Sequence, residues 1–234
     1  MTEHTHQYGD VALSYIKHGY GNRVFILFHG FGQSKHAFEE IMKAASPAYT
    51  CYAFDLFFHG NSKWPYQQPL TKKEWQLLFA DFLDKQRITH FSVGGFSMGC
   101  RLALATAEIM PQCIEQLFLL APDGIKNNVW FTVATRWMGT RWLFKKLVVD
   151  GNLFIRVANA AYRHRLVDKH MHQLALYQMS NRDKRMRVYE TWTTLRRMVF
   201  NVNHLSALLN RHRTAVTMVV GERDTIIKVR DVQR

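Results

Sequence analysis

The sequence has few cysteines, few acidic residues and no long apolar run, and each shortage excludes a class of protein. The three cysteines, at positions 51, 100 and 113, show no C-x-x-C spacing and are odd in number. We therefore expect reduced, packed thiols in a cytoplasmic protein. No apolar stretch approaches the ~20 residues of a membrane-spanning helix. The polar segment Met1–Asp10 also lacks the apolar run of a secretory signal.

Motifs for metals and cofactors are also lacking. No cluster of His, Cys, Asp and Glu has the spacing of a metal site, and no glycine-rich phosphate loop is present. We therefore expect no cofactor and no metal. The chain shows no internal repeat, and its 234 residues are enough for one or two domains with a substantial core.

Acidic residues are scarcest in the middle of the chain. The net charge is +13, and residues 123–213 hold 17 lysines and arginines against five aspartates and glutamates. This aromatic-rich stretch has no clear strand and is expected to be helical. Its charge could guide an anionic substrate or dock on an acidic membrane surface. Alternatively, the charges form a solvated outer face over an aromatic core. No nucleic-acid motif accompanies the charge, so no nucleic-acid partner is expected.

The remaining sequence alternates between short apolar runs and amphipathic segments. Helices are expected over residues 34–45 and over residues 101–110. A further helix is expected to begin at the capping-box pattern Thr71–Glu74. This alternation predicts an α/β fold with a mostly parallel sheet and flanking helices. The expected core comprises residues 1–122 and 214–234, with a helical, basic insertion at 123–213. Strands are expected at residues 11–18, 24–28, 49–54, 88–93, 114–121 and 214–220.

The most informative motif is Gly95-Phe96-Ser97-Met98-Gly99, which stands between an expected strand and an expected helix. A serine on so sharp a turn has a strained backbone, and its neighbours must lack bulk. In return, its hydroxyl stands clear of the sheet near a helix N-terminus, which favours developing negative charge. Ser97 is therefore the candidate nucleophile, and it needs a general base to take its proton.

Two upstream segments complete a family pattern. One expected strand ends in His29-Gly30-Phe31-Gly32, and the next ends in Asp55-Leu56-Phe57-Phe58-His59-Gly60-Asn61-Ser62. With the serine motif, these segments resemble the single-domain, serine-dependent α/β-hydrolases from about Ala12 to the end of the chain. The insertion at 123–213 occupies the position of that family's helical lid.

The resemblance assigns roles to several residues. It implies that the backbone N–H groups of Phe31 and Met98 form the oxyanion hole. It also implies that His29, His59 and Asp55 order loops rather than act in the chemistry.

The resemblance places the acid that orients the catalytic histidine at Asp224, in a G-x-x-D turn after the last expected strand. Asp123 is the alternative acid, and capping of a following helix is the alternative role for Asp224. The family's histidine follows the acid, yet all twelve histidines precede Asp224. We therefore expect a C-terminally truncated hydrolase that lacks the last strand and helix. His204 and His212 are the remaining candidates for the base.

The expected function is cleavage of a carboxylic ester or thioester through an acyl-enzyme at Ser97. Low activity is expected because the catalytic histidine is missing. One alternative is a cofactor-free lyase on the same scaffold, whose multiply charged substrate would suit an arginine-rich lid. Another is a degenerate, non-catalytic protein that binds a small molecule. The expected partner is a small acyl compound, and the basic insertion is compatible with an anionic one. The basic, aromatic insertion is also compatible with peripheral contact with a membrane.

Overall fold

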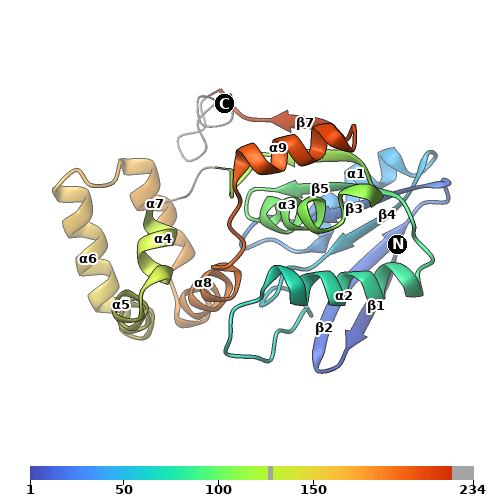
Figure 1. Ribbon diagram of the computed structural model, residues 1–234. Coiled ribbons are helices and arrows are strands. Elements are labelled where there is room, and N and C mark those ends of the chain that lie inside the picture. The colour runs from blue at the N-terminus through green and yellow to red at the C-terminus, as the bar shows by residue number, and fades with distance from the viewer. Residues whose placement is uncertain (126–128, 223–234) are drawn as a thin grey trace.

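The computed structural model describes residues 1–125 and 129–222. Within these residues, seven strands form one sheet in the order β1-β2-β4-β3-β5-β6-β7 (Figure 1). The neighbours from β4 to β7 pair in parallel, and β1 and β2 add an antiparallel edge. The mostly parallel α/β sheet is therefore confirmed. The strands are β1 (Thr2–Tyr8), β2 (Val11–His18), β3 (Arg23–Phe28), β4 (Tyr49–Phe54), β5 (Phe91–Phe96), β6 (Ile114–Leu120) and β7 (Ala215–Val219).

Two strands differ from the sequence prediction by more than one residue at an end. β1 lies in the N-terminal segment that looked merely polar, and it joins β2 through a tight turn in which Gly9 has φ 56°. All of its residues except His6 are exposed, so the strand carries almost no hydrophobic pattern. β5 begins at Phe91 rather than residue 88, and runs to the residue before Ser97.

Helices cover both faces of the sheet (Figure 1). On one face, a 3-10 turn, η1 (Lys35–Phe38), and α1 (Glu39–Ala45) form a small apolar cluster with β2, β3 and β4. The other face carries α2 (Lys72–Lys85), α3 (Gly99–Ile109) and α9 (Val202–Arg211), which share the main core cluster. A second 3-10 turn, η2 (Pro111–Cys113), leads from α3 into β6.

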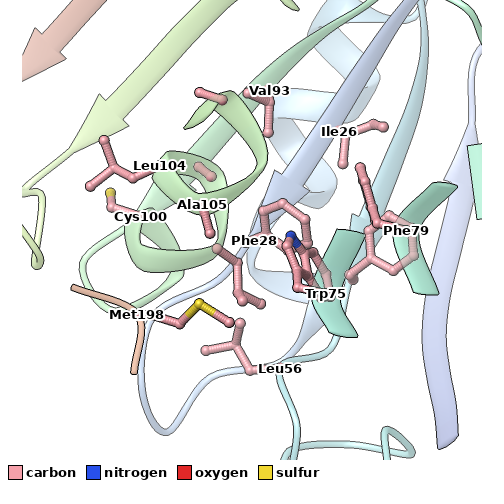
Figure 2. Packing of buried hydrophobic residues seen from close by; sticks show 14 of the residues in the cluster. Ile26, Phe28, Leu56, Trp75, Phe79, Val93, Cys100, Leu104, Ala105 and Met198 are labelled. Atoms are coloured by element: carbon pink, nitrogen blue, oxygen red, sulfur yellow. The ribbon is translucent and has the colours of Figure 1, made fainter. Parts of the chain in front are cut away.

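The main core is built around aromatic side chains of α2 and the central strands. Trp75 lies edge-on to Phe28, and its indole N–H donates to the Thr106 hydroxyl at 2.9 Å (Figure 2). Met198, which follows the cap helices, is fully buried in the same cluster. The capping box predicted at the start of α2 is confirmed: Thr71 and Glu74 exchange the expected hydrogen bonds.

The described part of residues 123–213 is helical. Among the described residues, helices α4 to α8 form a cap at one end of the core, and α6 lies farthest from the sheet (Figure 1). Phe144, Val148, Phe154, Met179 and Val188 give this cap a small apolar cluster of its own. No helix among residues 1–125 and 129–222 is long and apolar enough to cross a membrane. The cap helices are α4 (Val129–Arg136), α5 (Met138–Val149), α6 (Gly151–Arg163), α7 (Lys169–Gln178) and α8 (Arg182–Leu195).

Candidate active site

Ser97 occupies a strained turn between β5 and α3. Its φ is 49°, a left-handed conformation that non-glycine residues adopt at a cost of about 1–3 kcal/mol. Three backbone hydrogen bonds hold it there. The Ser97 N–H donates to the Leu120 carbonyl at 2.8 Å, and the Ser97 carbonyl accepts from Cys100 at 3.0 Å and Asp123 at 3.2 Å. The end of β6 and the start of α3 thus fix the backbone of a half-buried serine.

The two glycines of the motif are required by backbone packing. A Cβ added at Gly95 would lie 2.6 Å from the Cys100 nitrogen, and one at Gly99 would lie 2.0 Å from the Phe28 carbonyl oxygen. Both contacts are with backbone, which cannot swing away as a side chain can. The helix and the neighbouring strand therefore meet too closely for any other residue at these two positions.

The loop after β3 lies against this turn. Gly30 abuts the Phe96 ring, its N–H donates to the Gln33 side chain at 3.0 Å, and its carbonyl accepts from the Gln33 N–H at 3.2 Å. Among the described residues, no acceptor is hydrogen-bonded to the N–H groups of Phe31 and Met98. These two donors are therefore free to bind an external acceptor.

His29 orders this loop as a neutral ring. Its Nδ1 donates to the Gly30 carbonyl at 2.7 Å, and its Nε2 accepts from the Leu56 N–H at 3.0 Å. Burial lowers the pKa of His29 to about 4. The Asp55 carboxylate is 3.7 Å from Nε2, but that nitrogen carries no proton in this tautomer, so the pair is not a salt bridge.

His59 is used in the same way. Its Nδ1 donates to the Phe57 carbonyl at 3.0 Å, and its Nε2 accepts from the Gly32 N–H at 3.0 Å. Burial is the main reason that the pKa of His59 falls to about 4. Both nitrogens of both rings are thus occupied by backbone, and neither His29 nor His59 is free to act as the base.

Asp55 holds the second loop through a buried ion pair. Its carboxylate accepts from the Lys35 ammonium at 3.1 Å, from the Lys35 N–H at 2.8 Å and from the Asn61 N–H at 3.2 Å. A Cβ at Gly60 would lie only 2.0 Å from the same carboxylate, so glycine is needed for this approach. Asp55 therefore links the two loops that carry His29 and His59.

Asp123, the alternative acid, is engaged elsewhere. Arg101, in the first turns of α3 and fully buried, donates to both carboxylate oxygens of Asp123, at 2.7 and 2.9 Å. The same guanidinium donates to the Met198 carbonyl at 2.9 Å and lies 4.1 Å from the centroid of the Phe131 ring. Asp123 and Met198 flank the cap helices in the chain. Arg101 therefore joins the two ends of the cap beside the strained serine.

Neither histidine proposed as the base is hydrogen-bonded to Ser97 in the described part of the chain. Asp224 lies outside the described residues, so its prediction is untested. His204 and His212 are exposed, at the start of α9 and just beyond its end. Within residues 1–125 and 129–222, no histidine is hydrogen-bonded to the Ser97 hydroxyl. The predicted nucleophile and oxyanion donors thus lie on adjoining loops, and no described histidine pairs with Ser97.

Two of the three cysteines are buried and poorly suited to act as nucleophiles. Burial raises the pKa of Cys51 to about 11 and also raises that of Cys100, so both thiols stay protonated. No group of three or more His, Cys, Asp and Glu in the described part of the chain is arranged to hold a metal ion.

Comparison with known proteins places this architecture in a family. Residues 23–234 match the family model for the alpha/beta hydrolase fold. The chain belongs to this family. Among solved structures, a thermophilic esterase from Thermogutta terrifontis superposes with a TM-score of 0.69 at 15% identity. The match covers 99% of this chain and 84% of that one. At such low identity, the likeness concerns the fold of this α/β-hydrolase chain.

Curated relatives match only parts of the chain. The probable lysophospholipase BODYGUARD 1 of Arabidopsis thaliana is 31% identical over 132 residues, which cover 54% of this chain and 26% of the relative. The dihydrolipoyllysine-residue acetyltransferase component of the acetoin cleaving system of Cupriavidus necator is 30% identical over 127 residues. These residues cover 53% of this chain and 34% of the relative. The matches thus span between about a quarter and a third of the length of these relatives.

Sequence reasoning missed two sets of side chains near the site. Arg101 was overlooked, although a single arginine among the apolar residues of α3 is a signal that it needs a buried partner. Lys184 and Arg187 of α8 lie with Phe31 around a small cavity. They could not be singled out in a segment where basic residues are so frequent.

Proposed function

We propose that this chain is a serine hydrolase of the α/β fold that cleaves a carboxylic ester or thioester through an acyl-enzyme. The observation that carries the proposal is the strained turn at Ser97, beside the unoccupied N–H groups of Phe31 and Met98. Strain persists where the surrounding structure over-determines it, and such positions are concentrated at active sites. The probable lysophospholipase among the relatives agrees with this chemistry.

In the proposed mechanism, the Ser97 oxygen attacks the ester carbonyl while a general base takes its proton, and His204 and His212 are the candidates for that base. The carbonyl oxygen becomes an oxyanion that accepts hydrogen bonds from Phe31 and Met98. The alcohol or thiol then leaves with a proton, and water releases the acyl group from the serine. Asp224 is the proposed acid that orients the histidine ring.

Because no described histidine is paired with Ser97, we expect the chain to hydrolyse simple esters only weakly. The oxyanion hole and binding alone can leave about 10³ to 10⁴-fold catalysis over water. The same observation favours a second candidate, a non-catalytic protein that binds a small acyl compound. A lyase that uses Ser97 without acylation is the third candidate. A covalent adduct at Ser97 separates the hydrolase from the other two candidates.

Labelling with an alkyl fluorophosphonate tests the proposal. We expect one adduct, mapped to Ser97 by mass spectrometry of peptides, and no adduct in Ser97→Ala. The control is Ser206→Ala, which removes an exposed serine of α9 and should leave labelling unchanged. Labelling that persists in Ser97→Ala, or that never occurs in the wild-type chain, contradicts the proposal. Ligand binding that survives Ser97→Ala without any adduct would favour the binding protein.

We also propose that the outer side of the cap contacts an acidic membrane surface. Met138, Trp142 and Val149 share one side of α5 and are 79%, 61% and 56% exposed. Lys146, on the same helix, lies with its ammonium 3.8 Å from the centroid of the Trp142 ring. Exposed aromatic side chains among cations suit the boundary between headgroups and acyl chains, where basic residues attract anionic lipid.

Sedimentation with lipid vesicles tests this contact. We expect the chain to bind vesicles containing phosphatidylserine and to bind pure phosphatidylcholine much more weakly, and Trp142→Ser to lower the first affinity about tenfold. Tyr20→Ser is the control, because Tyr20 is 82% exposed on the core, away from the cap. Equal binding by Trp142→Ser, or self-association that buries the α5 surface instead, would rule the contact out.

A further inference from the structure

A small cavity lies between the cap and the loop after β3. Its volume is about 60 Å³, several times the ~10–15 Å³ that one water molecule needs by a comparable measure. The cavity is therefore large enough for a small polar group. It is lined by Phe31, Gly32, Tyr177, Gln178, Lys184 and Arg187.

The cavity carries two cations without acidic partners. In the described part of the chain, no carboxylate lies within 4.0 Å of the Lys184 ammonium or the Arg187 guanidinium. The Lys184 ammonium lies 4.1 Å from the centroid of the Tyr177 ring, with only a long 3.5 Å contact to the Tyr177 carbonyl. Both side chains are half-buried. Their positive charges are thus partly removed from water and not neutralised by the protein.

Arg185, on the same helix, has a structural role and serves as a comparison for Arg187. Arg185 donates to the Val148 carbonyl at 2.8 Å and contacts the Met179 carbonyl at 3.4 Å, which ties α8 to α5 and α7. Arg187 donates no such hydrogen bond to any other described residue. A half-buried guanidinium that donates to none of the described residues is suited to bind a ligand.

The cavity adjoins the proposed chemistry. Phe31 and Gly32 belong to the loop that supplies one oxyanion donor, and the Gln178 side chain would lie 3.3 Å from a Cβ added at Gly32. The cap therefore packs directly on that loop. Arg187 is also near His59, whose pKa is lowered by burial first and further by the charge of Arg187. A group bound in the cavity would thus lie beside the loop that receives the ester carbonyl.

We infer that this cavity binds the phosphate group of a substrate whose ester or thioester carbonyl is attacked by Ser97. A planar guanidinium pairs with two phosphate oxygens at once, and a lysine adds a second point charge, which suits a dianion better than a singly charged carboxylate. The inference rests on the proposed function for the reaction, but the binding of phosphate stands by itself. It names a class of substrate, acyl compounds that carry a phosphate monoester.

Calorimetric titration of the full 234-residue chain with butyl phosphate tests the cavity. We expect Arg187→Gln and Lys184→Gln each to weaken binding about tenfold or more, and Arg187→Lys to restore part of the loss. Arg182→Gln is the matched control: it removes an exposed cation from the first position of α8 and should change affinity less than twofold. Circular dichroism of each variant verifies that it is folded, and Lys184→Gln stands in if Arg187→Gln is not.

Several outcomes would overturn the inference. Butyrate binding as tightly as butyl phosphate contradicts a phosphate site, as does equal binding by wild type, Arg187→Gln and Lys184→Gln. If Arg187→Gln and Lys184→Gln weaken butyl phosphate binding no more than Arg182→Gln does, the general positive charge of the chain attracts the ligand, and this cavity does not.

Fluorophosphonate labelling on the same preparations separates this inference from the proposed function. If Ser97 is labelled but Arg187→Gln does not change phosphate binding, the phosphate site is wrong and the proposed hydrolase function stands. If phosphate binding depends on Arg187 but Ser97 is never labelled, the cavity stands and the hydrolase is wrong.

Discussion

Arg101→Met is expected to lower the free energy of unfolding by about 3–5 kcal/mol, the range for removing one partner of a buried ion pair. The variant leaves the Asp123 carboxylate, whose side chain is 19% exposed, without its two charged hydrogen bonds. It also leaves the Met198 carbonyl without its donor. Urea unfolding followed by tryptophan fluorescence measures the change.

A double variant separates the charge from the packing. Arg101→Met with Asp123→Leu removes both charges, and apolar replacement of a whole buried pair is often neutral. We therefore expect it to recover at least half of the stability lost in Arg101→Met. A loss below about 1 kcal/mol in the single variant would show that the pair contributes little. A double variant less stable than the single one would show that Asp123 is needed for another reason.

Acidification is expected to destabilise the fold well before the carboxylates titrate. The folded pKa of His29 and of His59 is about 4, below the ordinary value of 6.5. As the pH falls below 6.5, His29 and His59 therefore become protonated in the unfolded chain while they stay neutral in the folded chain. The stabilisation is complete above pH 6.5 and is lost between pH 6.5 and 4, with about 2 kcal/mol per histidine gone by pH 5.

Urea unfolding at pH 7.5, 6.5, 5.75 and 5 tests this. The window above pH 5 matters because unpaired carboxylates titrate mostly below it. His59→Gln should reduce the slope of stability against pH in this range, whereas His90→Gln, at an exposed position, should not. A free energy of unfolding that stays constant from pH 7.5 to 5 would contradict the neutral, buried state of both rings.

The parts of the site that depend on local geometry were predictable. Glycines on either side of Ser97 are needed because backbone approaches at 2.6 and 2.0 Å leave no room for a Cβ, and this requirement is visible in the spacing alone. The capping box that opens α2 is similarly local. The capping box and the approach of Gly95 to Cys100 each involve residues within five positions of one another, whereas Gly99 meets the distant Phe28 carbonyl and was anticipated only from the motif's spacing.

The parts that depend on distant partners were not predictable. β1 is stabilised by pairing with β2, and its own residues, nearly all exposed, show no apolar pattern. The bond from Arg101 to Met198 joins residues 97 positions apart, so no local pattern indicates it. The same holds for the cavity at Arg187, which exists only because α7 and α8 fold back onto the loop after β3.

The bonds from Arg101 to Asp123 and Met198 also bear on how this chain could change over evolutionary time. The Arg101 guanidinium holds the residues at both ends of the cap, Asp123 and Met198, so the cap is a closed loop on the core. The entropic cost of closing a loop grows slowly with its length. Helices could be added or exchanged between these two residues while the spacing around Ser97 stays the same. Changes in the sequence and length of the cap could thus alter the substrate while the strained turn at Ser97 stays the same.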